Sequence, residues 1–302
     1  MKQTIKKIIF IAILSVISIS LTACSLNNNQ IENNSIEFVD GYGYTTIIEN
    51  NLERIVSVSP NITEILCSLG LEEKIVGRTE YCDYPETISN IDSVGDILNP
   101  NIEKIVELKP DIVISEGMQS SSDFSDSLRN LGIKVINLRT NKTLEGTYES
   151  IKNIGIVTSR NEQADQIINN MKKDLLNISE KLENVEKKTV FYIVGFGTYG
   201  LSTATGDTFI NDILEKAGLI NVASDGENWS YNLEKLYEHN PEIIICSKYY
   251  NTKQNIKTDE GLKKLKAIQQ DQIIEVDNNK IDRQTVRNIE AIKELVEKIY
   301  NI

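Results

Sequence analysis

Residues 103–115 read Glu103-Lys-Ile-Val-Glu-Leu-Lys-Pro-Asp-Ile-Val-Ile-Ser115, which predicts a helix, a proline stop and a short apolar strand. The same order returns, position by position, in Glu234-Lys-Leu-Tyr-Glu-His-Asn-Pro-Glu-Ile-Ile-Ile-Cys246. A second match pairs Ile65-Leu66 and Gly70-Leu71 with Ile213-Leu214 and Gly218-Leu219. Two matches in the same order indicate that one α/β unit occurs twice, once in each half of the chain.

Short apolar runs alternate with helical patterns on both sides of the repeated stretch. Strands are expected at residues 54–58, 74–77, 111–114 and 134–138, and again at residues 190–194, 242–246 and 272–276. Strands that alternate with helices of this length form βαβ units and a mainly parallel sheet. The sequence therefore predicts an α/β fold with two Rossmann-like lobes of similar topology.

One long helix is predicted between the two copies. Apolar residues from Ala164 to Leu182 follow the i, i+3, i+4 spacing of an amphipathic helix, with charged residues on the other face. We therefore expect an N-terminal lobe at residues 36–160, a connecting helix at 161–186 and a C-terminal lobe at 187–302. A single helix makes a stiff connection, so closure between the lobes should be small.

The N-terminus has the pattern of an export signal. Three lysines precede an apolar run from Ile8 to Leu21, which is shorter than the roughly 20 residues of a membrane-spanning helix. The run ends in Leu21-Thr-Ala-Cys24, which resembles a bacterial lipobox. We expect a lipoprotein signal peptide at residues 1–23, lipidation of Cys24 by acyl chains such as palmitate, and a flexible tether at residues 24–35.

This pattern places the protein on the extracytoplasmic face of the bacterial cell membrane, held there by its lipid anchor. The alternatives are an uncleaved membrane anchor or a plain secretory signal, in which Cys24 carries no lipid.

The composition argues against several classes of protein. With 32 basic and 44 acidic residues the formal net charge is −12, which disfavours a nucleic-acid binder. His239 is the single histidine and the four cysteines form no C-x-x-C pair, so no zinc site is expected. Ser57 and Ser59 have no recognisable histidine base, so nucleophilic hydrolysis lacks support. We expect no metal site, no cofactor and no catalytic residue.

One motif has the spacing of a nucleotide-binding site. Gly195-Phe-Gly-Thr-Tyr-Gly200 satisfies the dinucleotide fingerprint G-x-G-x-x-G. That fingerprint requires a helix to begin at the glycines, so that its N-terminus meets the pyrophosphate. Here the next helix is expected only near Asp207, so the motif is interpreted as a loop at the edge of a cleft.

Further motifs occur in a characteristic order from residue 36 to the C-terminus. They are Arg54-Ile-Val-Ser-Val-Ser-Pro60, Thr63-Glu-Ile-Leu66, Tyr81-Cys-Asp-Tyr-Pro85, Val94-Gly95, Asn99-Pro-Asn-Ile-Glu103, Leu108-Lys-Pro-Asp-Ile-Val113, Gly218-Leu-Ile-Asn-Val222 and the region from Arg283 to Arg287. With the lipobox, this set resembles the iron-siderophore/cobalamin (class III) periplasmic substrate-binding lipoproteins of ABC transporters. The resemblance implies two α/β lobes bridged by a rigid helix, with the ligand in the cleft between them.

The resemblance also implies the function and the partners. The protein would capture a metal chelate, either a corrinoid such as cobalamin or a ferric siderophore, and deliver it to an ABC permease dimer. A haem receptor of the same architecture is the alternative, and a lipid-anchored α/β hydrolase or chelatase is a weaker one. A structural adhesin is disfavoured because two such lobes form a concave site. We expect a monomer that is not an enzyme and does not bind nucleic acid.

The aromatic residues gather in two corresponding loops. Tyr81 and Tyr84 follow a strand of the first lobe, and Trp229 and Tyr231 follow a strand of the second. Ligands of open α/β sheets bind at such loops, and rings supply contact area at low entropic cost. The resemblance implies that rings at Tyr81 and Trp229 contact a corrinoid, although an aromatic expected near Ile97 is absent. The alternative is that the rings pack only against their own loops.

Four arginines are candidates for contact with an anionic ligand, because guanidinium groups match carboxylates and phosphates: Arg78, Arg139, Arg283 and Arg287. Ion pairing within the protein is the alternative for each. Two or more of them in the cleft would favour an anionic ferric siderophore.

Glu103 and Glu234 begin the equivalent helix in each lobe. Acidic residues in a first turn stabilise the helix dipole, which is a sufficient explanation for either residue alone. The resemblance implies a different role, in which one glutamate per lobe meets arginines on the two permease subunits.

Overall fold

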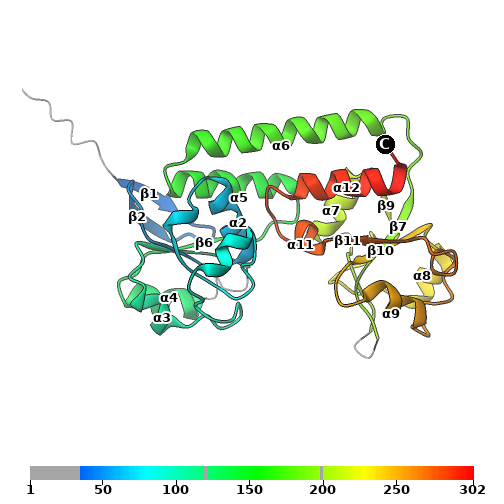
Figure 1. Ribbon diagram of the computed structural model, residues 1–302, viewed down its shortest axis with the longest axis horizontal. Coiled ribbons are helices and arrows are strands. Elements are labelled where there is room, and N and C mark those ends of the chain that lie inside the picture. The colour runs from blue at the N-terminus through cyan, green and yellow to red at the C-terminus, as the bar shows by residue number, and fades with distance from the viewer. Residues whose placement is uncertain (1–34, 118–121, 198–199) are drawn as a thin grey trace, which may run out of the picture. The chain divides into compact units, whose positions relative to one another are not determined.

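Two mainly parallel β-sheets, one in each half of the chain, form the framework of the protein (Figure 1). The computed structural model describes residues 35–117, 122–197 and 200–302. Within it, Ile36–Ile302 form one compact unit. The predicted α/β class with two lobes is confirmed.

The sheet of the first lobe has four parallel strands in the order β4-β3-β5-β6. The strands are β3 (Ile55–Ser57), β4 (Ile75–Arg78), β5 (Ile112–Glu116) and β6 (Val135–Leu138). The helices are α2 (Pro60–Ser68), α3 (Ile102–Glu107), α4 (Ser122–Asn130) and α5 (Leu144–Val157), with 3-10 turns at Glu72–Lys74 and Glu86–Asn90. Every residue of β3, β5 and β6 is buried, because helices cover both faces of the sheet.

A two-stranded ribbon precedes this sheet and was not expected from the sequence. It consists of β1 (Ser35–Val39) and β2 (Thr45–Glu49). The buried Asp40 carboxylate accepts the main-chain N–H groups of Tyr42 and Tyr44 and so closes the turn. The same side chain accepts the N–H of Asn137, which attaches the ribbon to β6.

The sheet of the second lobe has five strands in the order β11-β10-β7-β8, with β9 also paired to β7. The strands are β7 (Thr189–Gly195), β8 (Ser202–Thr203), β9 (Ile220–Asn221), β10 (Ile243–Ser247) and β11 (Ile273–Val276). The helices are α7 (Phe209–Lys216), α8 (Leu233–His239), α9 (Thr252–Thr258), α10 (Lys266–Gln269), α11 (Asn278–Asp282) and α12 (Asn288–Tyr300). Only β8 is antiparallel to its neighbour β7 among the described pairs.

The repeated stretches form the same structure in both lobes. In each, a short helix is followed by a proline and a buried strand: α3 and β5 in the first lobe, α8 and β10 in the second. The second match is also structural, because Gly70 after α2 and Gly218 after α7 both have a φ of 74°. Such a left-handed residue ends a helix, and glycine adopts it without strain.

The connecting helix α6 spans Asn161–Leu182, and residues 183–186 lie outside it. It ends earlier than expected because the chain turns there, with the N–H of Val185 donating to the carbonyl of Leu182 at 3.1 Å. The buried face of α6 packs on α5 and also contacts α12 (Figure 1). The helix therefore touches elements from both halves of the chain.

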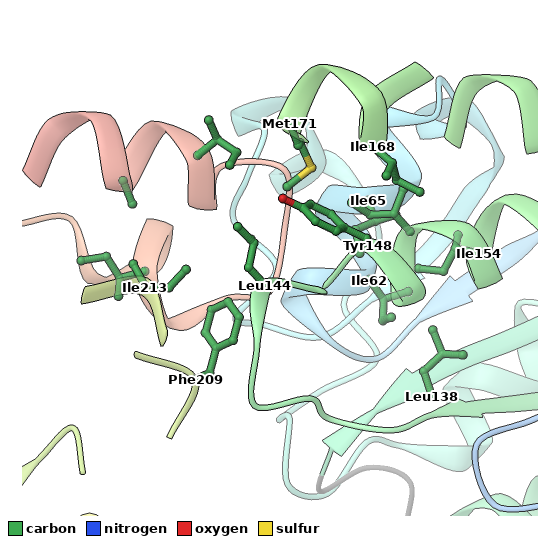
Figure 2. Packing of buried hydrophobic residues seen from close by; sticks show 14 of the residues in the cluster. Ile62, Ile65, Leu138, Leu144, Tyr148, Ile154, Ile168, Met171, Phe209 and Ile213 are labelled. Atoms are coloured by element: carbon green, nitrogen blue, oxygen red, sulfur yellow. The ribbon is translucent and has the colours of Figure 1, made fainter. Parts of the chain in front are cut away.

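One hydrophobic core continues through both lobes. Ile62 and Ile65 of α2 lie near Tyr148 of α5, and Met171 of α6 lies beside the same ring (Figure 2). The same cluster includes Phe209 of α7 and residues of α12. The outer face of each sheet has a separate, smaller core of its own. Because the largest core is shared, the lobes are held together by packing as well as by the connecting helix.

Candidate ligand-binding site

A cavity of about 370 Å³ lies where the strands of the first lobe end and the segment between α11 and α12 passes. Its lining residues are Ser59, Pro60, Asn61, Ile97, Glu116, Gly117 and Thr140 from the first lobe, and Asp282, Arg283 and Gln284 from the second. Open α/β sheets bind ligands at the carboxyl ends of their strands. Both lobes thus contribute to one cavity at the edge where a ligand is expected.

Glu116, the last residue of β5, has a carboxyl group held inside this cavity. The residue is 5% exposed, and Oε2 accepts a hydrogen bond from Nδ2 of Asn61. Among the residues that the structure describes, Oε1 has no hydrogen-bond partner. Burial raises the pKa of Glu116 to about 7, although the bond from Asn61 opposes the rise.

The main chain of Glu116 is held firmly in place. The hydroxyl of Ser59 accepts the N–H of Glu116 and donates to its carbonyl oxygen, both at 3.1 Å. This hydroxyl therefore links the ends of β3 and β5, and the position of the carboxyl group follows from the sheet.

Asp282, the last residue of α11, provides a second carboxyl group from the other lobe. It accepts hydrogen bonds from Nδ2 of Asn278 at 3.1 Å and from the hydroxyl of Tyr192 at 3.4 Å. Burial raises the pKa of Asp282 to about 6, against the effect of these donors and of Arg283. The cavity is therefore lined by one carboxyl group from each lobe, that of the buried Glu116 and that of Asp282, which is an exposed residue.

Arg283 and Arg287 lie together, as expected, but both are paired with acidic residues of the first lobe. Nε of Arg287 donates to Oε2 of Glu64 at 2.8 Å, and NH1 of Arg283 donates to Oε1 of Glu64 at 2.9 Å. NH1 of Arg283 also donates to Asp83 at 2.6 Å. Two guanidinium groups thus face two carboxylates, which is ion pairing within the protein.

Glu64 was not expected to be a site residue, although it lies in the motif Thr63-Glu-Ile-Leu66. Its side chain is almost fully buried on α2, between isoleucines that predict an apolar face. A buried acid needs a partner. Nothing in the local sequence indicates that the partner is an arginine more than 200 residues away.

Two of the residues expected to contact the ligand, Arg78 and Tyr231, have partners within the protein. Arg78 donates hydrogen bonds to the carbonyl oxygens of Thr79, Ile88 and Ser89, so its guanidinium stabilises the 3-10 turn at Glu86–Asn90. Tyr231 is 7% exposed, packs against Phe191 and donates to the carbonyl of Val222 at 2.8 Å. Its ring belongs to the core of the second lobe, because its hydroxyl finds a main-chain partner there.

The other three aromatic rings are exposed. Tyr81 is 54% exposed, Tyr84 45% and Trp229 44%. The ring of Tyr84 lies against the guanidinium of Arg287, 3.9 Å from the centroid, and the carbonyl of Tyr81 accepts from Arg283 at 3.2 Å. The loop of Tyr81 and Tyr84 is thus attached to the second lobe through the two arginines.

Trp229 is held in an unusual main-chain conformation. Its φ is 62°, which is uncommon for a bulky residue and requires support from its surroundings. Its N–H donates to Oγ1 of Thr205 at 3.1 Å, and its carbonyl accepts from the N–H of Thr203 at 2.9 Å. The loop therefore keeps a large ring at the surface of the second lobe.

Glu103 and Glu234 are the second residues of α3 and α8, and both are exposed. Each helix begins at an asparagine cap: Oδ1 of Asn101 accepts from the N–H of Lys104, and Oδ1 of Asn232 accepts from the N–H groups of Glu234 and Lys235. The two lobes thus present the same local arrangement of cap, acid and lysine.

The remaining motifs have structural roles. Strand β7 ends at Gly195 and the next helix begins at Phe209, so no helix begins at the glycines of residues 195–200, of which 198–199 lie outside the described residues. His239 is the last residue of α8, at the edge of the Tyr231 ring. The hydroxyl of Ser57 donates to the carbonyl of Ser59 and accepts from Thr63.

Within residues 35–117, 122–197 and 200–302, no group of three or more histidine, cysteine, aspartate or glutamate side chains is placed to hold a metal ion. In the same ranges no helix is long and apolar enough to cross a membrane. Cys24 lies outside these ranges.

Comparisons with known proteins agree on one kind of protein. The sequence model of a family described as periplasmic binding protein matches residues 55–280. An ABC transporter substrate-binding lipoprotein of Bacillus subtilis, YvrC, is 33% identical over 86% of this chain and 84% of its own length. A vitamin B12-binding protein of Vibrio campbellii is 24% identical, covering 81% of this chain and 88% of its own.

A solved structure supports the same grouping. It is described as a possible iron-binding (periplasmic solute-binding) protein from Staphylococcus epidermidis. It superimposes with a TM-score of 0.73 at 30% identity, over 82% of this chain and 99% of its own.

Proposed function

The chain belongs to the periplasmic binding protein family, and we propose that it is the lipid-anchored substrate-binding protein of an ABC importer that captures a metal chelate. The observation that carries this proposal is the cavity lined by residues of both lobes at the strand ends. A receptor must hold its ligand where both lobes reach it, because the permease then recognises the loaded protein by its two lobes together.

The exposed rings support a large, flat ligand. Tyr81 and Trp229 lie on corresponding loops of the two lobes and are exposed although aromatic side chains favour burial. A corrinoid or a ferric siderophore offers the apolar faces that such rings contact. Ile97 lines the cavity at the position where an aromatic was expected, so the contact there is aliphatic.

The site gives no support to an enzymatic role. Hydrolysis needs a nucleophile next to a base, whereas the hydroxyls of Ser57 and Ser59 are bonded to main-chain groups and to Thr63. We therefore propose binding and delivery without catalysis.

Two further parts of the proposal concern location and partner. Lipidation of Cys24 would hold the mature protein on the outer face of the cell membrane, with residues 24–35 as its tether. Glu103 and Glu234 would dock on the two permease subunits, because matched charges on both lobes fix the orientation of a two-lobed receptor.

Titration of the purified mature protein with cobalamin, several ferric siderophores and haem tests this function. Trp229 is the only tryptophan, so its fluorescence should be quenched when a chelate binds near it. Saturable quenching by a corrinoid or a ferric siderophore supports the proposal, and saturation by haem alone would favour the haem receptor. If none of these chelates binds, the proposed function is wrong.

A further inference from the structure

The buried Oε1 atom of Glu116 is unusual for a folded protein. Buried polar atoms nearly always have hydrogen-bond partners, and leaving one without a partner is destabilising. Oε1 has none among the described residues, yet the carboxyl group is held in place through Ser59 and Asn61 and lines the cavity. An acceptor fixed in this way is suited to a donor that arrives with the ligand.

The charges around the cavity favour a neutral donor over an anion. Among the described residues that line the cavity, Arg283 is the only basic one, and its guanidinium is paired with Glu64 and Asp83. Arg139 lines a neighbouring hollow with Gly117 and Thr140, and its Nε donates to the carbonyl of Gly41. Within the cavity itself an entering group therefore meets the carboxyl groups of Glu116 and Asp282, whereas the positive charge of Arg139 acts from the neighbouring hollow.

We propose that Glu116 and Asp282 accept hydrogen bonds from carboxamide or hydroxyl groups on the rim of the ligand, so that the protein selects chelates with neutral donors over chelates with carboxylates. This inference rests on the proposed function and names the ligand class for the same cavity. A carboxamide offers two N–H donors, which matches an acceptor without a partner. A carboxylate offers none and would be desolvated beside two acids.

The size of the cavity indicates that only the rim of the ligand enters it. A volume of about 370 Å³ is near the lower end for small-molecule sites, so it accommodates one edge or substituent of a macrocycle. The faces of the macrocycle would then lie outside it, against the exposed rings. Selection of the substituent and stacking of the ring are therefore carried by different residues.

The test uses ligands that differ in one group. The purified mature protein is titrated with cyanocobalamin, whose rim carries carboxamides, and with its monocarboxylic acid, in which one amide is hydrolysed. Haem and its dimethyl ester form a second pair, with and without carboxylates. The proteins are wild type, Glu116→Gln, Asp282→Asn and, as a matched control, Glu37→Gln on the exposed face of β1.

Wild type and Glu37→Gln should bind the uncharged member of a pair about tenfold or more tightly than the acid, given the cost of an unmatched charged group. In Glu116→Gln the preference should shrink, because the new amide also donates to a carboxylate. The preference should be larger at pH 8 than at pH 5.5 in wild type, since a protonated Glu116 can donate. It should depend less on pH in Glu116→Gln, in which Asp282 is the remaining acceptor that titrates.

Each other result overturns the inference. Equal or tighter binding of the acids by wild type would do so, and so would an unchanged preference in both Glu116→Gln and Asp282→Asn. These results would leave the proposed function intact, because a chelate would still bind. Failure of every chelate to bind would overturn the inference and the proposed function together.

Discussion

Arg287 and Glu64, separated by 223 residues, form a buried ion pair in which Nε of Arg287 donates to Oε2 of Glu64 at 2.8 Å. The two side chains are 6% and 1% exposed. The pair joins the start of α12 to α2, close to the cavity, and Arg283 shares the same carboxylate. This carboxylate therefore links the second lobe to the first through two arginines.

We expect Glu64→Gln to lower the free energy of unfolding by about 3–5 kcal/mol, because it removes the counter-charge of the buried Arg287 and one of the two carboxylates that pair with Arg283. Chemical denaturation followed by circular dichroism measures the loss. The matched control is Glu53→Gln, whose partner Lys74 is at the surface and whose loss should cost about 1 kcal/mol or less. A stability of Glu64→Gln within that same range would contradict the role of the pair.

Stability should fall with rising pH through the titration of Glu116. Burial raises its pKa from 4.5 to about 7, so the folded state binds a proton that the unfolded state has already released. Its favourable contribution is complete below about pH 4.5 and is lost as pH rises through about 7. At 1.36 kcal/mol per pKa unit the loss is about 3 kcal/mol.

Urea denaturation between pH 4.5 and 8 measures this effect as the difference between wild type and Glu116→Gln. The difference removes the titration of other groups, including Asp282, whose pKa is also raised. Parallel stability curves for the two proteins would show that Glu116 is ionised normally.

We expect Tyr81→Ala and Trp229→Ala each to weaken chelate binding by about 1–3 kcal/mol, the value of burying a large ring. Isothermal titration with the chelate identified above measures the loss, and circular dichroism checks folding. Leu176→Ala, which removes an exposed apolar side chain from α6, serves as the control and should bind like wild type. Normal affinity in both aromatic variants would exclude these rings from the binding surface.

The double variant Glu103→Ala, Glu234→Ala should bind ligand normally but fail in transport. Removing the matched charges takes away the contacts that orient the receptor on its permease. Glu107→Ala with Glu238→Ala is the matched control, because these exposed acids lie one turn further along the same two helices. Permease pull-down and ligand uptake distinguish the two double variants. If the permease captures both equally well, Glu103 and Glu234 have only the role of stabilising the helix dipole.

Cys24→Ser should release the protein from the membrane without changing its affinity for ligand. Acyl chains contribute about 0.8 kcal/mol per buried methylene, so two or three of them anchor a protein stably. Fractionation of cells followed by immunoblotting measures retention, and Ser25→Ala is the neighbouring control. Retention of the Cys24→Ser protein on the membrane would show that lipid is not the anchor.

Local patterns predicted the elements of this protein well. The stretches that begin at Glu103 and Glu234 form the helix, proline and strand that their periodicity indicates. The ribbon of β1 and β2 and the helices α5, α9 and α12 were not predicted. The ribbon and α9 are short elements of mixed polarity and lack a clear period, whereas α5 and α12 are long enough to show one and were missed. The resemblance to binding proteins predicted the family, which the comparisons confirm.

The site residues could not be assigned to the same extent. Arg78 bonds to the turn at Glu86–Asn90 and Tyr231 packs in the core of the second lobe, and neither partner is indicated by the local sequence. Tyr81 and Trp229 remain predictions, because exposure shows that the rings are available and says nothing of what they contact.

The sequence by itself determined the repeated α/β unit, the connecting helix and the order of the lobes. The reason is that apolar residues recur every two positions in a strand and every 3.6 in a helix, so each segment shows its own pattern. Only the tertiary structure decided that Glu64 pairs with both Arg283 and Arg287, and that Glu116 and Asp282 line one cavity. These relationships join residues from opposite halves of the chain. Their energy depends on burial and distance after the lobes have packed, which no spacing along the sequence records.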